Sequence, residues 1–318
     1  MIVCVSANPG LDRRIRLRSL ALGEVNRALS SEPMPGGKAA HVALAVRALG
    51  APTAWLGFLG ASIGEQLGAE LRLAGIEVLP VQTQAPTRVN LELIEDSGRI
   101  TEVLEPGAPP TSDELEQFLA ILEKLLRGAW KGALLVIAGS LPAGVPEGLY
   151  SRLIRIAQSA GSKVFLDTSG NALETGLKAG PDLVKPNRRE VEALFGKTLH
   201  GPDDALMAGK QLIAQGAKSA VVTLGGQGLV WVESQDGPLW IARPPKLRAI
   251  STVGCGDVTL AGFAYAASVG WSGEKAVRFA TACGAANCSA QRAGAISAGT
   301  VADLMPRIEI QSSTRPPS

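Results

Sequence analysis

The sequence predicts an α/β fold in which helices cover both faces of a mostly parallel sheet. Short apolar runs have the composition of fully buried strands, at 133–137, 164–166, 183–184 and 220–223. Longer segments with helical periodicity lie near them, at 112–127, 146–158 and 203–215. Strands that alternate with helices are typical of βαβ units, and such sheets bind ligands beyond the carboxyl ends of their strands.

Composition and charge are those of an ordinary globular protein. Of the 318 residues, 46% are apolar and 19% charged, and Lys plus Arg (31) exceed Asp plus Glu (29) by only two. This balance argues against nucleic acid or anionic lipid as partners. The uncharged run 258–271 contains Gly and Ser and is shorter than the roughly 20 apolar residues of a spanning helix. We therefore expect no membrane partner and, without a basic leader, a cytoplasmic location.

A small second sheet is expected in the first third of the chain. In residues 12–18, polar and apolar side chains alternate as in a strand with one solvent-exposed face. That face contains Arg14, Arg16 and Arg18. We interpret that face as solvated or as a subunit contact. A second extended segment, 87–94, turns back at 96–98. Segments of about 12–35 and 87–105 thus predict a β-sheet lid on a domain spanning 1–310, followed by a disordered tail, 311–318, rich in Ser, Thr and Pro.

The segment 251–257, Ser-Thr-Val-Gly-Cys-Gly-Asp, precedes the apolar helical run 258–269. Glycines before a helix let several backbone amides point at one spot, where the helix dipole also favours negative charge. Asp257 in the first turn can take a proton from a hydroxyl that attacks phosphate. The pattern fits an anion-binding site, but glycine-rich helix starts with an Asp are often only helix caps, and this segment alone favours that simpler interpretation.

Three further segments have the residues of a phosphate site. Paired glycines at Gly36 and Gly37 allow a close approach to a ligand before a helix expected from about 41 to 49, and Lys38 supplies a charge. Lys185 and Asn187 follow a buried strand and can face phosphates, with Glu190 near a metal-bound water. The glycines of 223–228 form a turn or a backbone wall for a nucleotide. Each segment alone also fits an ordinary turn or helix start.

Together these segments resemble the ribokinase (PfkB) family of sugar kinases, in its phosphosugar branch. The resemblance spans about 1–305, and its markers come in the family's order: Asn8-Pro9-Gly10-Leu11-Asp12, Gly23-Glu24-Val25-Asn26-Arg27, Gly36-Gly37-Lys38, Thr87-Arg88-Val89-Asn90, Gly139-Ser140-Leu141-Pro142, Lys185-Pro186-Asn187 and the 251–257 segment. It implies a ribokinase-like three-layer sandwich, a central mostly parallel sheet and a small β-sheet lid.

The resemblance also implies roles for individual residues. Asp257 is the base, and the transferred phosphoryl group is held by the amides of Gly254, Cys255 and Gly256. Sugar and sugar phosphate are bound by Asp12, Arg27, Gly37, Lys38, Arg88 and Asn90. ATP is bound around Lys185, Asn187, Thr223, Gly225 and Gly228, and Glu190 is linked to Mg²⁺.

The implied function is ATP- and Mg²⁺-dependent phosphorylation of a phosphorylated ketohexose, with fructose 1-phosphate to fructose 1,6-bisphosphate favoured. Tagatose 6-phosphate and fructose 6-phosphate are alternative acceptors, and a non-catalytic sugar-phosphate binder on the same fold is an alternative from another class. A nicotinamide-dependent dehydrogenase is disfavoured, because no GxGxxG follows the first strand. The family resemblance and the strand alternation in the lid also predict a homodimer through the lid.

The chain departs from the family pattern directly after Lys38. The family usually has Gly at the next position and Asn two residues further on, whereas this chain has Ala39, Ala40 and then His41. His41 replaces the Asn as a hydrogen-bonding group, admits another sugar or another acceptor altogether, or packs inside the helix. Cys255 stands where Ala is usual. The cysteines lie in no CxxC pair and are expected to be reduced structural thiols: Cys4, Cys255, Cys283 and Cys288.

Overall fold

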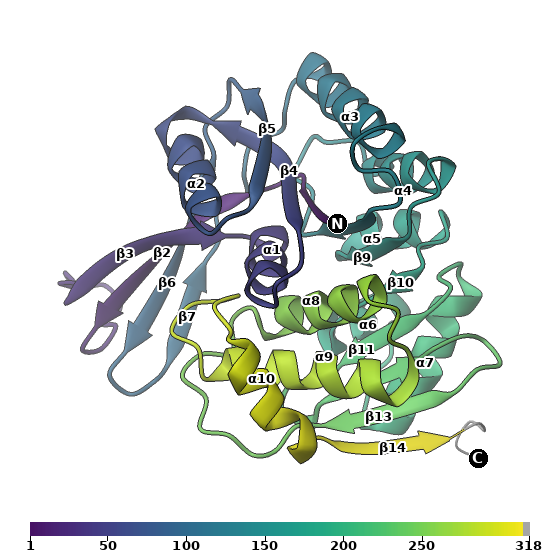
Figure 1. Ribbon diagram of the computed structural model, residues 1–318. Helices are drawn as coiled ribbons and strands as arrows, with labels where there is room; N and C mark the ends of the chain where they lie inside the picture. The colour runs from purple at the N-terminus through teal and green to yellow at the C-terminus, as the bar shows by residue number, and fades with distance from the viewer. Residues whose placement is uncertain (314–318) are drawn as a thin grey trace.

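The computed structural model describes residues 1–313, and Figure 1 shows helices packed on both faces of a large sheet with a small sheet projecting from one side. The large sheet has the strand order β14-β13-β12-β11-β10-β9-β8-β1-β4-β5. Its strands are β1 (Ile2–Ser6), β4 (Thr53–Gly60), β5 (Glu77–Thr83), β8 (Leu134–Ala138), β9 (Val164–Asp167), β10 (Leu183–Val184), β11 (Ala220–Thr223), β12 (Leu229–Val232), β13 (Leu239–Arg243) and β14 (Glu309–Ser313). All pairs from β11 to β5 are parallel and those from β11 to β14 are antiparallel, so the predicted mostly parallel sheet is confirmed.

Two apolar clusters hold the helices to the two faces of this sheet. One face carries α1 (Lys38–Ala48), α2 (Ala61–Leu73), α8 (Cys255–Ser268), α9 (Gly273–Cys288) and α10 (Ala298–Leu304). The other carries α3 (Ser112–Arg127), α4 (Leu149–Ser159), α5 (Gly170–Leu177), α6 (Arg188–Phe195) and α7 (Pro202–Ala214). Short 3₁₀ turns, η1 (Gly225–Gln227) and η2 (Met305–Arg307), complete the helical elements of residues 1–313. None of these helices is long and apolar enough to cross a bilayer.

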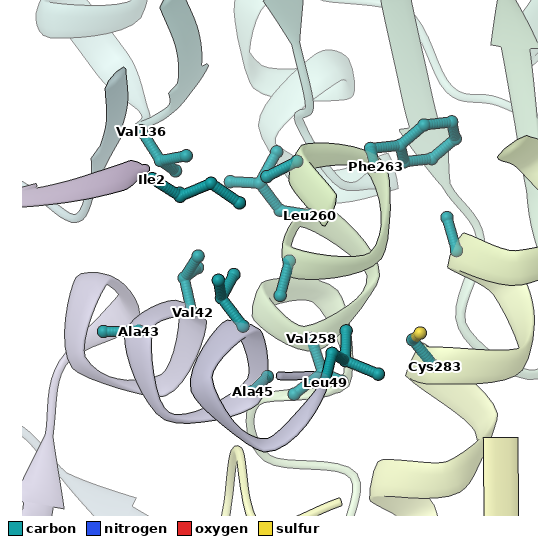
Figure 2. Packing of buried hydrophobic residues seen from close by; sticks show 14 of the residues in the cluster. Ile2, Val42, Ala43, Ala45, Leu49, Val136, Val258, Leu260, Phe263 and Cys283 are labelled. Atoms are coloured by element: carbon teal, nitrogen blue, oxygen red, sulfur yellow. The ribbon is translucent and has the colours of Figure 1, made fainter. Parts of the chain in front are cut away.

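The apolar runs of the sequence form strands because both faces of the sheet are covered. All five residues of β1 and of β8 are buried, with no polar alternation. Figure 2 shows one side of this core, where Val42 of α1 and Leu260 of α8 lie near Ile2 of β1 and Val136 of β8. The packing brings the N-termini of α1 and α8 to the same edge of the sheet.

The small sheet has the order β3-β2-β6-β7, made by β3 (Ser30–Gly36), β2 (Gly10–Leu17), β6 (Arg88–Glu95) and β7 (Ile100–Val103). The predicted second sheet is therefore present, but the solvated arginine face is wrong at Arg14. Arg14 stands opposite Glu92 in the register and forms a buried ion pair with it, Nε to Oε2 2.9 Å. A charged side chain is buried here because its partner lies on the neighbouring strand.

The end of the chain differs from the prediction as well. Residues 311–313, predicted to be disordered, belong to β14, and Gln311 pairs with Ile241 of β13. The rest of the predicted tail, 314–318, lies outside the described residues. Backbone hydrogen bonds form this edge strand, whose side chains are mostly exposed, so it lacks an apolar pattern.

Candidate active site

A cleft of about 1300 Å³ lies where the carboxyl ends of the parallel strands, the small sheet and the N-termini of α1 and α8 meet. It is lined by these sequence-predicted residues: Asp12, Gly37, Lys38, His41, Arg88, Asn90, Lys185, Asn187, Glu190, Thr223, Gly225, Gly228, Gly254, Cys255, Gly256 and Asp257. Arg27 is not among the lining residues, and it is exposed in the segment 18–29 that joins β2 to β3. The fold therefore collects all but one of the candidate residues in one cleft.

The start of α8 has the backbone geometry of an anion-binding helix N-terminus. Gly254, the N-cap, has φ 75°, and a Cβ atom there would come within 2.7 Å of Ala293 Cβ. The following amides have no carbonyl partner four residues earlier, although the Cys255 amide donates to Thr252 O at 3.3 Å. Lys185 Nζ lies 3.4 Å from the place where a Gly256 Cβ would stand, so its charge adds to that of the helix N-terminus. Asp257 is in the first turn and 7% exposed.

A carboxylate that the sequence analysis missed connects the two lysines of the cleft. Asp167, at the end of β9 and fully buried, lies 2.8 Å from Lys38 Nζ through Oδ1 and 2.8 Å from Lys185 Nζ through Oδ2. Burial would raise the pKa of the Asp167 carboxyl, but the charges of Lys185 and Lys38 outweigh this effect and hold its pKa below the ordinary value. Because Lys38 also lies 3.2 Å from Glu190 Oε1, its ammonium group is held near the start of α6.

Asn187 and Glu190 have a structural task at the start of α6. Asn187 is the N-cap, its Oδ1 accepts from the Glu190 amide at 3.0 Å, and Glu190 Oε2 accepts from the Asn187 amide at 2.8 Å. This reciprocal capping box fixes both side chains at the edge of the cleft. Glu190 therefore presents a carboxylate to the cleft in one fixed orientation.

His41 connects the small sheet to the start of α8. Its Nδ1 lies 2.8 Å from Asp257 Oδ2, and its Nε2 lies 3.4 Å from Asp12 Oδ2. Burial would lower the pKa of the imidazole, but the contacts with Asp12 and Asp257 outweigh it and raise the pKa to about 10. His41 is thus a cation at neutral pH, and its Nδ1–H donates to Asp257.

Two residues that line the cleft beside the small sheet contain buried polar atoms without partners in residues 1–313. Arg88 donates from its two terminal nitrogens to the carbonyls of Glu105 (2.7 Å) and Asn8 (3.0 Å), whereas its Nε is buried without a hydrogen-bond partner in residues 1–313. Asn90 Nδ2 donates to Asp12 Oδ1 at 2.8 Å, and its Oδ1 is also buried without a partner in that part of the chain. Because burying such groups costs about 1–3 kcal/mol each, they indicate a polar ligand here.

The opposite end of the cleft is formed by backbone and small side chains. Gly228, between η1 and β12, has φ 91°, and a Cβ atom there would overlap Ala242 O at 1.9 Å. Thr223, Gly225 and Gly228 line this part of the cleft. Further lining residues that were not predicted from the sequence are Thr281, Gly284, Ala285 and Cys288 of α9 and residues 244–247. The site is thus one cleft with a charged centre and two differently built ends.

The chain is similar in sequence and in structure to known proteins. The family described as pfkB family carbohydrate kinase matches residues 5–299. The 1-phosphofructokinase of Escherichia coli K12 is 33% identical over 317 residues, covering 98% of each chain. That of Bacillus subtilis is 30% identical over 310 residues, covering 98% of this chain and 99% of the relative. The solved structure of phosphofructokinase-2 from Escherichia coli has a TM-score of 0.89 at 31% identity, covering 96% of this chain and 98% of the other.

Proposed function

Since the chain belongs to the pfkB family of carbohydrate kinases, we propose that it transfers the γ-phosphoryl group of ATP to the 6-hydroxyl of fructose 1-phosphate, giving fructose 1,6-bisphosphate and ADP. The near full-length similarity to 1-phosphofructokinases supports this acceptor. The observation that carries the proposal is the position of Asp257. Its carboxylate stands at an anion-binding helix start beside Lys185, and through His41 it reaches Asp12 on the sugar side.

The reaction follows from this placement. Asp257 accepts the proton of the sugar hydroxyl as the hydroxyl oxygen attacks the γ-phosphorus of ATP. The charge that builds on the phosphoryl oxygens is stabilised by the amides of Gly254 and Gly256 and by Lys185. Asp167 holds Lys185 and Lys38 in place, so the cations do not reorganise during the reaction.

The sugar phosphate is held on the side of the small sheet. Arg88 offers its unpartnered Nε to the phosphate of the substrate, and Asp12, Asn90 and His41 Nε2 bind sugar hydroxyls. His41 takes the place of the family's Asn as a hydrogen-bonding group. Its positive charge also keeps the Asp12 and Asp257 carboxylates close together without net repulsion.

Glu190 suits a water-mediated contact to Mg²⁺. Residues 1–313 contain no cluster of three or more His, Cys, Asp or Glu side chains that could hold a metal ion. Mg²⁺ needs no such cluster, because it keeps several waters and binds through one or two carboxylates and the nucleotide phosphates. When bound, it neutralises phosphate charge. The use of ATP as the phosphoryl donor is consistent with a location in the cytoplasm.

A homodimer through the small sheet is part of the proposal. The segment 18–29 exposes Leu22 (87%), Val25 (80%) and Leu29 (55%) close to Arg27 in sequence. On the sheet itself Ile15 and Leu93 stand opposite each other and are half-buried. A second copy that covers these apolar side chains would place Arg27 at the interface.

The acceptor is tested by ADP release with fructose 1-phosphate, fructose 6-phosphate, tagatose 6-phosphate and fructose under Mg²⁺. We expect kcat/KM to be highest for fructose 1-phosphate. We also expect Arg88→Gln to raise the KM for the sugar phosphate about 10- to 100-fold, the effect of losing a charged hydrogen bond, with little change in the KM for ATP. A higher kcat/KM for another acceptor, or equal use of fructose, contradicts the proposal.

A further inference from the structure

Two of the four cysteines form a pair inside the cleft. Cys255, the first residue of α8, has its Sγ 3.1 Å from the Sγ of Cys288, the last residue of α9. Both line the cleft and both are partly exposed, whereas Cys4 and Cys283 are buried. The expectation of structural thiols therefore fits the buried Cys4 and Cys283, whereas Cys255 and Cys288 are accessible from the cleft.

The surroundings make one thiol of the pair more reactive than the other. The hydrogen bond from Cys255 lowers the pKa of Cys288 to about 7, while the same contact and burial raise the pKa of Cys255. Asn287 Nδ2 lies 3.4 Å from Cys255 Sγ and fixes that side chain. Burial raises the pKa of Cys4 and of Cys283. The thiolate is the nucleophilic form, so Cys288 is the cysteine that reacts and Cys255 is its neighbour in reach.

We propose that Cys288 and Cys255 are a modification site that reacts with peroxides and closes to a disulfide, which lowers turnover at the neighbouring anion site. The Cys288 thiolate attacks one oxygen of hydrogen peroxide, the O–O bond breaks, and the products are a sulfenic acid and, after protonation, one water. The Cys255 sulfur then attacks the sulfenic sulfur and releases the second water. Two thiols lose two electrons in total, and the peroxide gains them.

The loss of activity follows from where the two cysteines are anchored. A disulfide has an S–S bond of about 2.05 Å, so closure draws the two sulfur atoms together by about 1 Å. The Cys288 carbonyl accepts from the Ile250 amide at 2.7 Å, and the Cys255 carbonyl accepts from Thr259 Oγ1 at 2.8 Å. The segment 250–255 is thus tied to Cys288 at its start and ends at Cys255, and it leads directly into the anion site at the start of α8. A displacement of about 1 Å at such a site lowers turnover on the order of 100-fold.

The test treats the full-length protein with hydrogen peroxide near pH 7 and follows kinase activity together with the disulfide map by mass spectrometry. We expect a Cys255–Cys288 disulfide, a loss of the mass of two hydrogen atoms, a fall in kcat on the order of 100-fold, and recovery with dithiothreitol. Cys288→Ser should keep, in the presence of oxidant, the same activity that it has without oxidant, because no disulfide can form. Cys283→Ser, the matched control, should respond as the wild type does.

Two outcomes overturn the proposal: thiols at 255 and 288 that stay reduced while the protein is exposed to peroxide, or a mapped disulfide with unchanged kcat. The activity readout rests on the proposed kinase function, but the disulfide map does not. If no sugar phosphate is turned over, the map and the release of bound nucleotide on oxidation still decide whether the pair reacts and whether it alters the site.

Discussion

Asp167 is the residue whose replacement should have the largest effect on stability among the charged groups of the cleft. Asp167→Asn keeps the shape of the side chain and removes the charge that pairs with Lys38 and Lys185. Lys38 retains Glu190 as a partner, 3.2 Å away. Lys185 is 2% exposed and loses its only ion-pair partner in the described chain. The variant therefore leaves a buried ammonium group without a counter-charge.

The size of the effect follows from burial. Removing one partner of a buried ion pair costs about 3–5 kcal/mol in the free energy of unfolding. With an unfolding entropy of about 2.1 cal/mol/K per residue, the 318 residues give a fall in Tm of about 4–8 °C. The matched control is Glu116→Gln, which removes an exposed ion pair with Arg152. The Arg152 side chain is 50% exposed and the Glu116 side chain is 65% exposed. That pair is worth about 1 kcal/mol at most, so the control should shift Tm by no more than about 2 °C.

Differential scanning calorimetry of wild type and both variants at several pH values measures these shifts. The pKa of Asp167 is lowered in the folded state, so its contribution is fully present above the ordinary Asp pKa of about 3.9 and is lost as pH falls through the folded-state pKa. The difference between wild type and Asp167→Asn should therefore be largest near neutral pH and shrink in acid. A Tm of Asp167→Asn within about 2 °C of the wild type at pH 7 would refute this account of the buried charges.

The remaining predictions concern His41 and the small sheet. The chain has two histidines, and the exposed His200 provides a second imidazole signal for comparison. NMR should show His41 still protonated at pH 8. Titration of His41 near the ordinary pKa of about 6.5 would contradict the ion pairs described. Because that pKa is raised to about 10, the contribution of His41 to stability is fully present below about pH 6.5 and is lost as pH rises through the folded-state value, an effect that His41→Asn should remove. Sedimentation velocity should show a dimer, and Val25→Asp should weaken it about 100-fold or more, because each copy loses the burial of one apolar side chain; a wild-type monomer at all concentrations contradicts the proposed interface.

The parts of the fold that the sequence predicts well have strong local signals. The helix expected at 112–127 is α3 with those bounds, because Thr111 and Glu114 form a capping box at its start and Gly128 follows its end. The helix expected from 146 begins instead at Leu149, after Pro146 and the turn around Gly148. β14 was missed because an exposed edge strand depends on backbone pairing with β13, not on a side-chain pattern.

The missed features of the site depend on contacts between residues far apart in the chain. Asp167 follows a predicted strand, a position where a ligand-facing carboxylate is common, but nothing near it in sequence identifies Lys38 as its partner. The same holds for His41 with Asp257 and for Cys255 with Cys288. Local motifs identify which residues belong to the cleft, whereas the packing of the helices on the sheet decides which of them touch.

Turnover of Asp257→Asn tests whether phosphoryl transfer occurs at the start of α8 with Asp257 as the base. Steady-state ADP release with fructose 1-phosphate and calorimetric titration with ATP are measured on the same preparation. Loss of the base should lower kcat on the order of 10²- to 10⁴-fold, while the Kd for ATP stays within about threefold of the wild type. A kcat within about tenfold of the wild type would contradict the role of Asp257 and with it the account of the cleft.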